Sequence, residues 1–122
     1  MQLHYLQEGH VWVLIGAGAT NRDGRCVWLA VAHAAIDILC TLCRIGDLLP
    51  ASHVLQAGAY RICFDTTAYM ATCKAMHPTF FADVPFYPRA EIHFAVAPGQ
   101  VHEHFHVPLT WNPYGYSTYR GS

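Results

Sequence analysis

The sequence predicts one mainly β, antiparallel domain that also carries a short helix, and three observations lead to this prediction. The chain has 122 residues, which suits a single hydrophobic core. Hydrophobic residues make up 53% of it and charged residues only 12%, a composition that excludes an intrinsically disordered chain. Short segments that alternate between apolar and polar residues are separated by Gly, Pro, Asn and Asp, which is typical of strands joined by turns.

The first predicted strand covers residues 10–15, where His-Val-Trp-Val-Leu-Ile is rich in strand-forming side chains. Gly16 and Gly18 follow it, and the run at 21–24, Asn-Arg-Asp-Gly, has strong turn chemistry. A strand that ends in a turn is therefore expected over this part of the chain.

A second strand is predicted over residues 59–65, where apolar side chains occupy every second position. Residues 66–74 contain neither Gly nor Pro and come directly after Asp65, so that Asp65 or Thr66 can cap a short helix there. We therefore expect a strand followed at once by a helix.

Two further strands are predicted near the C-terminus. Residues 89–96 and 101–111 both alternate with period two, and Pro-Gly at 98–99 lies between them. Asn-Pro-Tyr-Gly at 112–115 then breaks the second run. The two runs are predicted to pair as a β-hairpin.

Residues 26–49 do not fit this pattern, because they are almost continuously apolar and rich in Ala, Leu and Ile, which favours helix. Three interpretations remain open: a membrane span, which His33, Asp37 and Arg44 oppose; a buried or surface-packed helix; or sequence that is no natural part of the domain. We expect residues 1–122 to form one domain in which 26–56 are an insertion.

The net charge and the cysteine content limit which partners and which cellular compartment we expect for the chain. The net charge is −1 and the pI is near 6.7, so no basic field is available to hold nucleic acid. A small globule with few charges exposes apolar surface that a second copy can cover, which predicts an oligomer.

The five cysteines are odd in number, which favours a reducing compartment over a disulfide framework, and residues 1–9 lack the pattern of a secretory signal. Neither a membrane nor a nucleic acid is an expected partner.

The most specific motif lies at the C-terminus. His106-Val107-Pro108-Leu109 is followed at 112–122 by Asn-Pro-Tyr-Gly-Tyr-Ser-Thr-Tyr-Arg-Gly-Ser, and this closely resembles the ending of the transthyretin-like 5-hydroxyisourate hydrolases. Three more blocks match that family in the right order. They are Thr-Asn-Arg-Asp-Gly-Arg at 20–25, Tyr60 to Thr66 with Tyr69, and Phe86-Tyr87-Pro88.

The resemblance implies a transthyretin-like antiparallel β-sandwich that assembles as a homotetramer, with active sites in a channel where subunits meet. It also implies hydrolysis of a small-molecule substrate, 5-hydroxyisourate, to 2-oxo-4-hydroxy-4-carboxy-5-ureidoimidazoline in urate catabolism, with no cofactor. Relatives can be cytoplasmic or peroxisomal, and the Arg-Gly-Ser ending is not the Ser-Lys-Leu peroxisomal signal.

The same resemblance assigns the site residues. His106 matches the family's histidine and can act as general base, because imidazole takes up protons near neutral pH. Arg25 and Arg120 match its two arginines, whose charge would hold an anionic substrate and the oxyanion that forms on attack. Tyr119, Gly121 and Ser122 belong to the terminal motif; Ser122 is expected in the catalytic set, and Tyr119 and Gly121 in substrate binding.

Departures from the family pattern keep other functions open. Members begin with a strand that carries an active-site histidine and continue with a second strand, and the ten residues before Val11 do not hold both, so His4 and His10 receive no role. A sandwich that lacks these strands is incomplete, and the chain could be a catalytically impaired member or a carrier of small ligands. His102, His104 and His106 lie at alternating positions that could bind zinc or copper, and Cys40 and Cys43 form a lone Cys-x-x-Cys.

Overall fold

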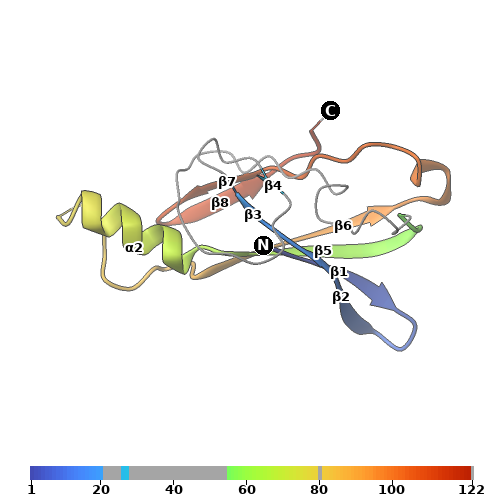
Figure 1. Ribbon diagram of the computed structural model, residues 1–122, viewed down its shortest axis with the longest axis horizontal. Helices are drawn as coiled ribbons and strands as arrows, with labels where there is room; N and C mark the ends of the chain where they lie inside the picture. The colour runs from blue at the N-terminus through green and yellow to red at the C-terminus, as the bar shows by residue number, and fades with distance from the viewer. Residues whose placement is uncertain (21–25, 28–54, 80, 122) are drawn as a thin grey trace.

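Four antiparallel strands form the main sheet, in the order β2-β1-β5-β6. The structure is a computed structural model that describes residues 1–20, 26–27, 55–79 and 81–121 (Figure 1). The strands of this sheet are β1 (Gln2–Gln7), β2 (Val11–Ala17), β5 (Gly58–Asp65) and β6 (Arg89–Val96). The strands predicted over 10–15, 59–65 and 89–96 are therefore confirmed.

β1 lies inside the sheet and pairs with a strand on each side. It forms a hairpin with β2 and pairs with β5 through Leu3 opposite Ile62 and Tyr5 opposite Tyr60. Within residues 1–20, β1 is the only strand that precedes β2, so this region holds one strand before Val11 and not two.

A β-hairpin lies against the main sheet and supplies the other side of the core. It consists of β7 (Leu109–Asn112) and β8 (Gly115–Thr118), and Asn112-Pro113-Tyr114-Gly115 turns the chain between them as expected. In Figure 1 this hairpin lies above β5 and β6, close to the short pair β3 (Ala19–Thr20) and β4 (Cys26–Val27). The structure thus confirms a mainly β, antiparallel fold.

One hydrophobic core joins the sheet to the hairpin. Alternation along β1, β5 and β6 turns Leu3, Tyr60 and Ile62 inward, and these side chains are almost fully buried. Leu109 and Trp111 reach the same cluster from β7. Burial of these large side chains is the main favourable contribution to the folding free energy.

The predicted helix is confirmed as α2 (Thr67–Met76), two residues longer at its end than expected. The Asp65 carboxylate accepts a hydrogen bond from the Thr67 backbone N–H at 2.9 Å, so Asp65 satisfies one free donor of the first turn. Thr66 takes another role, because its hydroxyl donates to the Tyr87 carbonyl oxygen and its backbone N–H donates to that of Pro88. Among the described residues, no helix is long and apolar enough to cross a membrane.

The predicted hairpin between 89–96 and 101–111 is wrong. β6 pairs with β5, Pro98–Gln100 form a short 3-10 helix (η1), and only Leu109–Asn112 of the second run form a strand, which pairs with β8. Residues 101–108 alternate because Phe105 and Val107 pack into the core as the chain crosses from the sheet to the hairpin. Burial of every second side chain produces the same sequence pattern as strand pairing.

The apolar run at 26–49 lies almost entirely outside the described residues. Its first two residues, Cys26 and Val27, form strand β4 opposite Ala19 and Thr20, so the predicted helix does not include them.

Candidate active site

The end of the chain lies beside the segment that carries His106. The backbone N–H of Gly121 donates to the carbonyl oxygen of His106 at 3.0 Å, which makes an isolated antiparallel bridge outside the named strands. A Cβ atom on Gly121 would lie 2.7 Å from the Cβ of His106, closer than real Cβ atoms come. Glycine at 121 therefore allows the two segments to make this contact.

His106 faces away from the core because its two neighbours face into it. Phe105 and Val107 are buried in the hydrophobic cluster, whereas His106 is half-buried. The imidazole is therefore held by a backbone anchored on both sides, yet part of it remains accessible. This placement suits a side chain that exchanges a proton with a bound ligand.

Arg120 is held by two contacts with the segment just before His106. Its Nη2 donates to Oε2 of Glu103 at 2.5 Å, and its guanidinium carbon lies 5.3 Å from the centre of the Phe105 ring. Tyr119 precedes it with an exposed side chain. The structure thus places Arg120 against two near neighbours of His106, and Gly121 against His106 itself.

Two of the predicted site residues, Arg25 and Ser122, lie outside the described residues. Whether Arg25 approaches His106 and Arg120 stays a prediction of the family motif.

The histidines considered as metal ligands do not lie on a strand. His102 is exposed in the turn that follows η1, His104 is exposed in the loop after it, and His106 alone of the three takes part in a bridge. Within the described parts of the chain, no group of three or more His, Cys, Asp or Glu residues is arranged to hold a metal ion. Cys40 and Cys43 lie outside those parts, while Cys63 and Cys73 are buried and free.

A second group of titratable residues lies on the face of the main sheet opposite the core, and sequence reasoning missed it. We call it the outer-face cluster: His4, Arg61, Cys63, Glu91 and His93. Glu91 is its centre, with Oε1 3.5 Å from the Cys63 sulfur and Oε2 3.9 Å from Arg61 and 3.8 Å from His93. The sequence signal that could have found it is the set of non-core residues at alternating positions of β5 and β6. The register of these strands places Arg61 opposite His93 and Cys63 opposite Glu91.

The surroundings in this cluster favour the neutral forms of two groups, the His4 imidazole and the Cys63 thiol. Burial and the nearby Arg61 and Arg89 lower the pKa of His4, although Glu91 opposes them. Burial, followed by the charge and hydrogen bond of Glu91, raises the pKa of the Cys63 thiol. A thiol that stays protonated is a poor nucleophile, so these surroundings do not favour Cys63 as a nucleophile.

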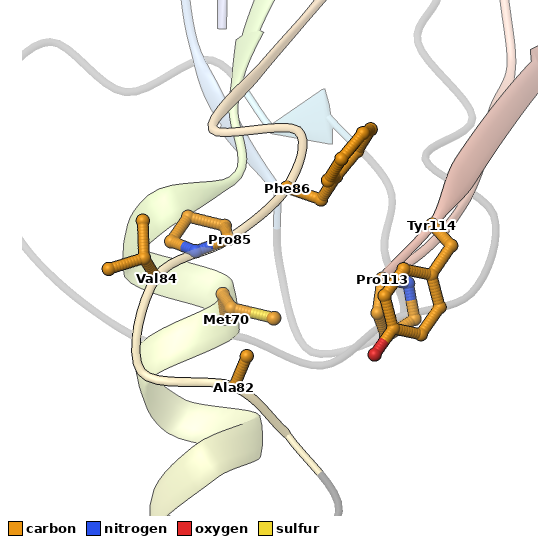
Figure 2. Close-up of a pocket in the computed structure, with 7 residues that line it drawn as sticks. All are labelled: Met70, Ala82, Val84, Pro85, Phe86, Pro113 and Tyr114. Atoms are coloured by element: carbon orange, nitrogen blue, oxygen red, sulfur yellow. The ribbon is translucent and has the colours of Figure 1, made fainter.

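An apolar pocket of about 340 Å³ opens between α2 and the β7–β8 turn (Figure 2). Met70 of α2 lies on one side, Pro113 and Tyr114 of the turn on the other, and the loop after the helix supplies Ala82, Val84, Pro85 and Phe86. None of the lining residues is charged, so the pocket does not suit an anionic substrate. Phe86 and Tyr114 beside it are 69% and 75% exposed.

Comparison with known proteins extends over nearly the whole chain. The model of the HIUase/Transthyretin family matches residues 1–121. The chain is 37% identical to the uric acid degradation bifunctional protein TTL of Arabidopsis thaliana, over 93% of this chain and 26% of that protein. It is 32% identical to a probable 5-hydroxyisourate hydrolase of Caenorhabditis elegans (98% of this chain, 67% of that one) and 33% identical to the 5-hydroxyisourate hydrolase of Salmonella dublin (91% and 60%).

These relatives differ from the chain in length. The chain spans about a quarter of the plant protein and about two thirds or less of the nematode and Salmonella proteins. No solved structure matches it.

Proposed function

This chain belongs to the HIUase/Transthyretin family, and from that membership we propose that it hydrolyses 5-hydroxyisourate. The observation that carries the proposal is that His106 and the Tyr119-Arg120-Gly121 motif lie side by side, in a chain with relatives named for this activity. The reaction would give 2-oxo-4-hydroxy-4-carboxy-5-ureidoimidazoline within urate catabolism.

In the proposed mechanism His106 acts as general base. Its imidazole takes a proton from water while the water oxygen bonds to a ring carbonyl carbon of the substrate. The oxyanion then collapses, the carbon–nitrogen bond of the ring breaks, and the proton on His106 passes to the departing nitrogen. Each step moves one proton and needs no cofactor.

Arginine side chains would stabilise the charge that this reaction develops. Arg120 remains exposed beside Phe105 and can bind an anionic substrate, and Arg25 is proposed to stabilise the oxyanion. Among the other members of the motif, Ser122 is proposed to assist catalysis through its hydroxyl, and Tyr119 to bind the substrate. Gly121 would contribute its backbone and its close contact with His106.

We also propose that the functional form is a homotetramer. Exposed aromatic side chains on the rim of the apolar pocket, Phe86 and Tyr114, form a surface that another copy can cover. A cytoplasmic or peroxisomal location is proposed because two of the cysteines, Cys63 and Cys73, are free. Residues 26–56 are proposed to be an insertion within one domain.

The decisive experiment follows 5-hydroxyisourate directly. Urate oxidase generates it from urate, and its absorbance decays slowly without a catalyst. The purified protein should accelerate this decay, and His106→Ala should reduce kcat by about 10²-fold or more, the range for a general base. His102→Ala, an exposed histidine four residues away, is the matched control and should keep full activity. Decay at the uncatalysed rate in the presence of the unaltered protein would refute the proposal.

A further inference from the structure

The contact between Glu103 and Arg120 carries an inference that goes beyond the family motif. The two residues are 17 positions apart and meet because the Gly121–His106 bridge brings the end of the chain to the segment before β7. Their side chains approach to 2.5 Å between Nη2 and Oε2. Glu103 belongs to neither the terminal motif nor the His106-Val107-Pro108-Leu109 block.

The Glu103–Arg120 pair does not serve mainly to stabilise the fold. The side chains are 60% exposed for Arg120 and 44% for Glu103, and ion pairs this exposed contribute little to the free energy of unfolding. Each long side chain also loses rotamer freedom when it is held in one geometry. The effect of the pair is therefore on where the guanidinium lies rather than on whether the chain folds.

Two contacts of different kinds restrain the guanidinium. Phe105 is 7% exposed, so its ring is fixed in the core, and Arg120 lies over it. Glu103 holds one terminal nitrogen of the same group. A guanidinium has five N–H donors in a planar fork, so one nitrogen can bind a carboxylate while the others remain for a ligand.

We infer that Glu103 is a positioning residue, which orients Arg120 over Phe105 before an anionic substrate binds. The inference rests on the proposed function, since Arg120 is the proposed substrate ligand. Pre-ordering a flexible arginine removes an entropy loss that binding would otherwise include. The consequence is confined to substrate binding, because Glu103 itself does not touch the reacting atoms.

The inference is testable because a purely electrostatic effect of Glu103 and a positioning effect change KM in opposite directions. Removing a carboxylate near an anion site should favour an anionic substrate and lower KM. If Glu103 acts by positioning Arg120, Glu103→Gln should instead raise KM about two- to fivefold, the most that a contact this exposed can supply, with kcat within about twofold of its original value. Glu103→Asp keeps the charge on a shorter side chain and should give an intermediate KM.

The experiment combines steady-state kinetics on 5-hydroxyisourate with the order of the Arg120 Nε–H group, measured by ¹⁵N relaxation. Glu103→Gln should make this group more mobile, while Glu8→Gln, which removes a carboxylate from the exposed β1–β2 turn, should change neither KM nor mobility. An unchanged or lower KM, or an equally ordered Arg120, overturns the inference. If the unaltered protein shows no turnover, the proposed function fails, and the relaxation measurement alone decides whether Glu103 orders Arg120.

Discussion

The backbone nitrogen of Gly121 and the carbonyl oxygen of His106 are 3.0 Å apart, and the hydrogen bond between them joins the end of the chain to the backbone of the residue that carries the imidazole. Gly121 is thus one of the residues that fix the position of the His106 backbone. A side chain at 121 must move the segment or the ring.

Gly121→Ala should lower activity because its Cβ would lie 2.7 Å from the Cβ of His106. A displacement of the imidazole by a fraction of an ångström or more should reduce kcat by about 10- to 100-fold. Gly99→Ala is the matched control, since a Cβ there meets no atom within 4 Å. Equal hydrolysis rates for the two variants, measured in the same absorbance assay, would show that His106 does not depend on this contact.

Arg25→Ala should reduce kcat by about 10²-fold if Arg25 stabilises the oxyanion, the usual loss when one such donor is removed. Arg25→Lys keeps a charge but not the planar fork, so it should recover only part of the rate. Arg89→Ala serves as control, because Arg89 is an exposed arginine of β6 that pairs with Glu91. A near-normal kcat for Arg25→Ala, with the fold intact by circular dichroism, contradicts the proposed role.

The outer-face cluster predicts that stability falls in mild acid. The pKa of His4 is lower in the folded chain than its ordinary value of 6.5, so below about pH 6.5 the unfolded chain binds a proton more readily than the folded one. The contribution of neutral His4 is therefore complete above pH 6.5 and is lost as the pH falls below it. Protonated His4 would lie near Arg61 and Arg89, and Glu91 only partly offsets this repulsion.

Urea unfolding of the original chain and of His4→Gln, at pH 7.5 and at pH 5.5, tests this. The original chain should lose more stability between the two pH values than the variant does. The other ionisable groups of the cluster, Glu91 and His93 among them, are present in both proteins, so the comparison isolates His4 to first order. Equal losses in the two proteins would remove His4 as the cause.

Phe86→Ser should weaken self-association if the aromatic residues beside the apolar pocket are covered by another copy. Truncating a buried aromatic anchor at an interface commonly costs about 2 kcal/mol or more, which corresponds to about 30-fold in Kd. Sedimentation velocity over a range of concentrations should then show smaller species. Val11→Ser, at another exposed apolar position on β2, should leave the assembly unchanged. A chain that is monomeric before substitution excludes the homotetramer.

The elements that sequence predicts best are those whose signal is local. β5 and β6 each alternate over enough residues to identify a strand, β2 is rich in strand-forming side chains, and α2 follows Asp65, which does cap it. β1 carries a weaker signal because only Leu3 and Tyr5 alternate in it before Leu6 breaks the pattern, and its place between β2 and β5 depends on pairing with distant residues.

The contacts between distant segments could not be predicted from sequence, and the candidate site depends on them. Alternation at Phe105 and Val107 shows that these side chains are buried, but not that the chain has left β6 and crossed to the hairpin. The family motif indicated His106 and Arg120 together, yet Glu103 belongs to no motif block. The contact between Glu103 and Arg120 is visible only in the three-dimensional structure.

The place of β1 in the sheet has a consequence for biosynthesis. Its neighbour β5 begins only at Gly58, near the middle of the chain, so a ribosome completes the β1–β2 hairpin well before β5 emerges. A lone two-stranded hairpin is at best marginally stable in water. Until translation reaches β5, Leu3 lacks its partner Ile62, and we expect a chaperone that binds exposed apolar segments to recognise the β1–β2 hairpin at this stage.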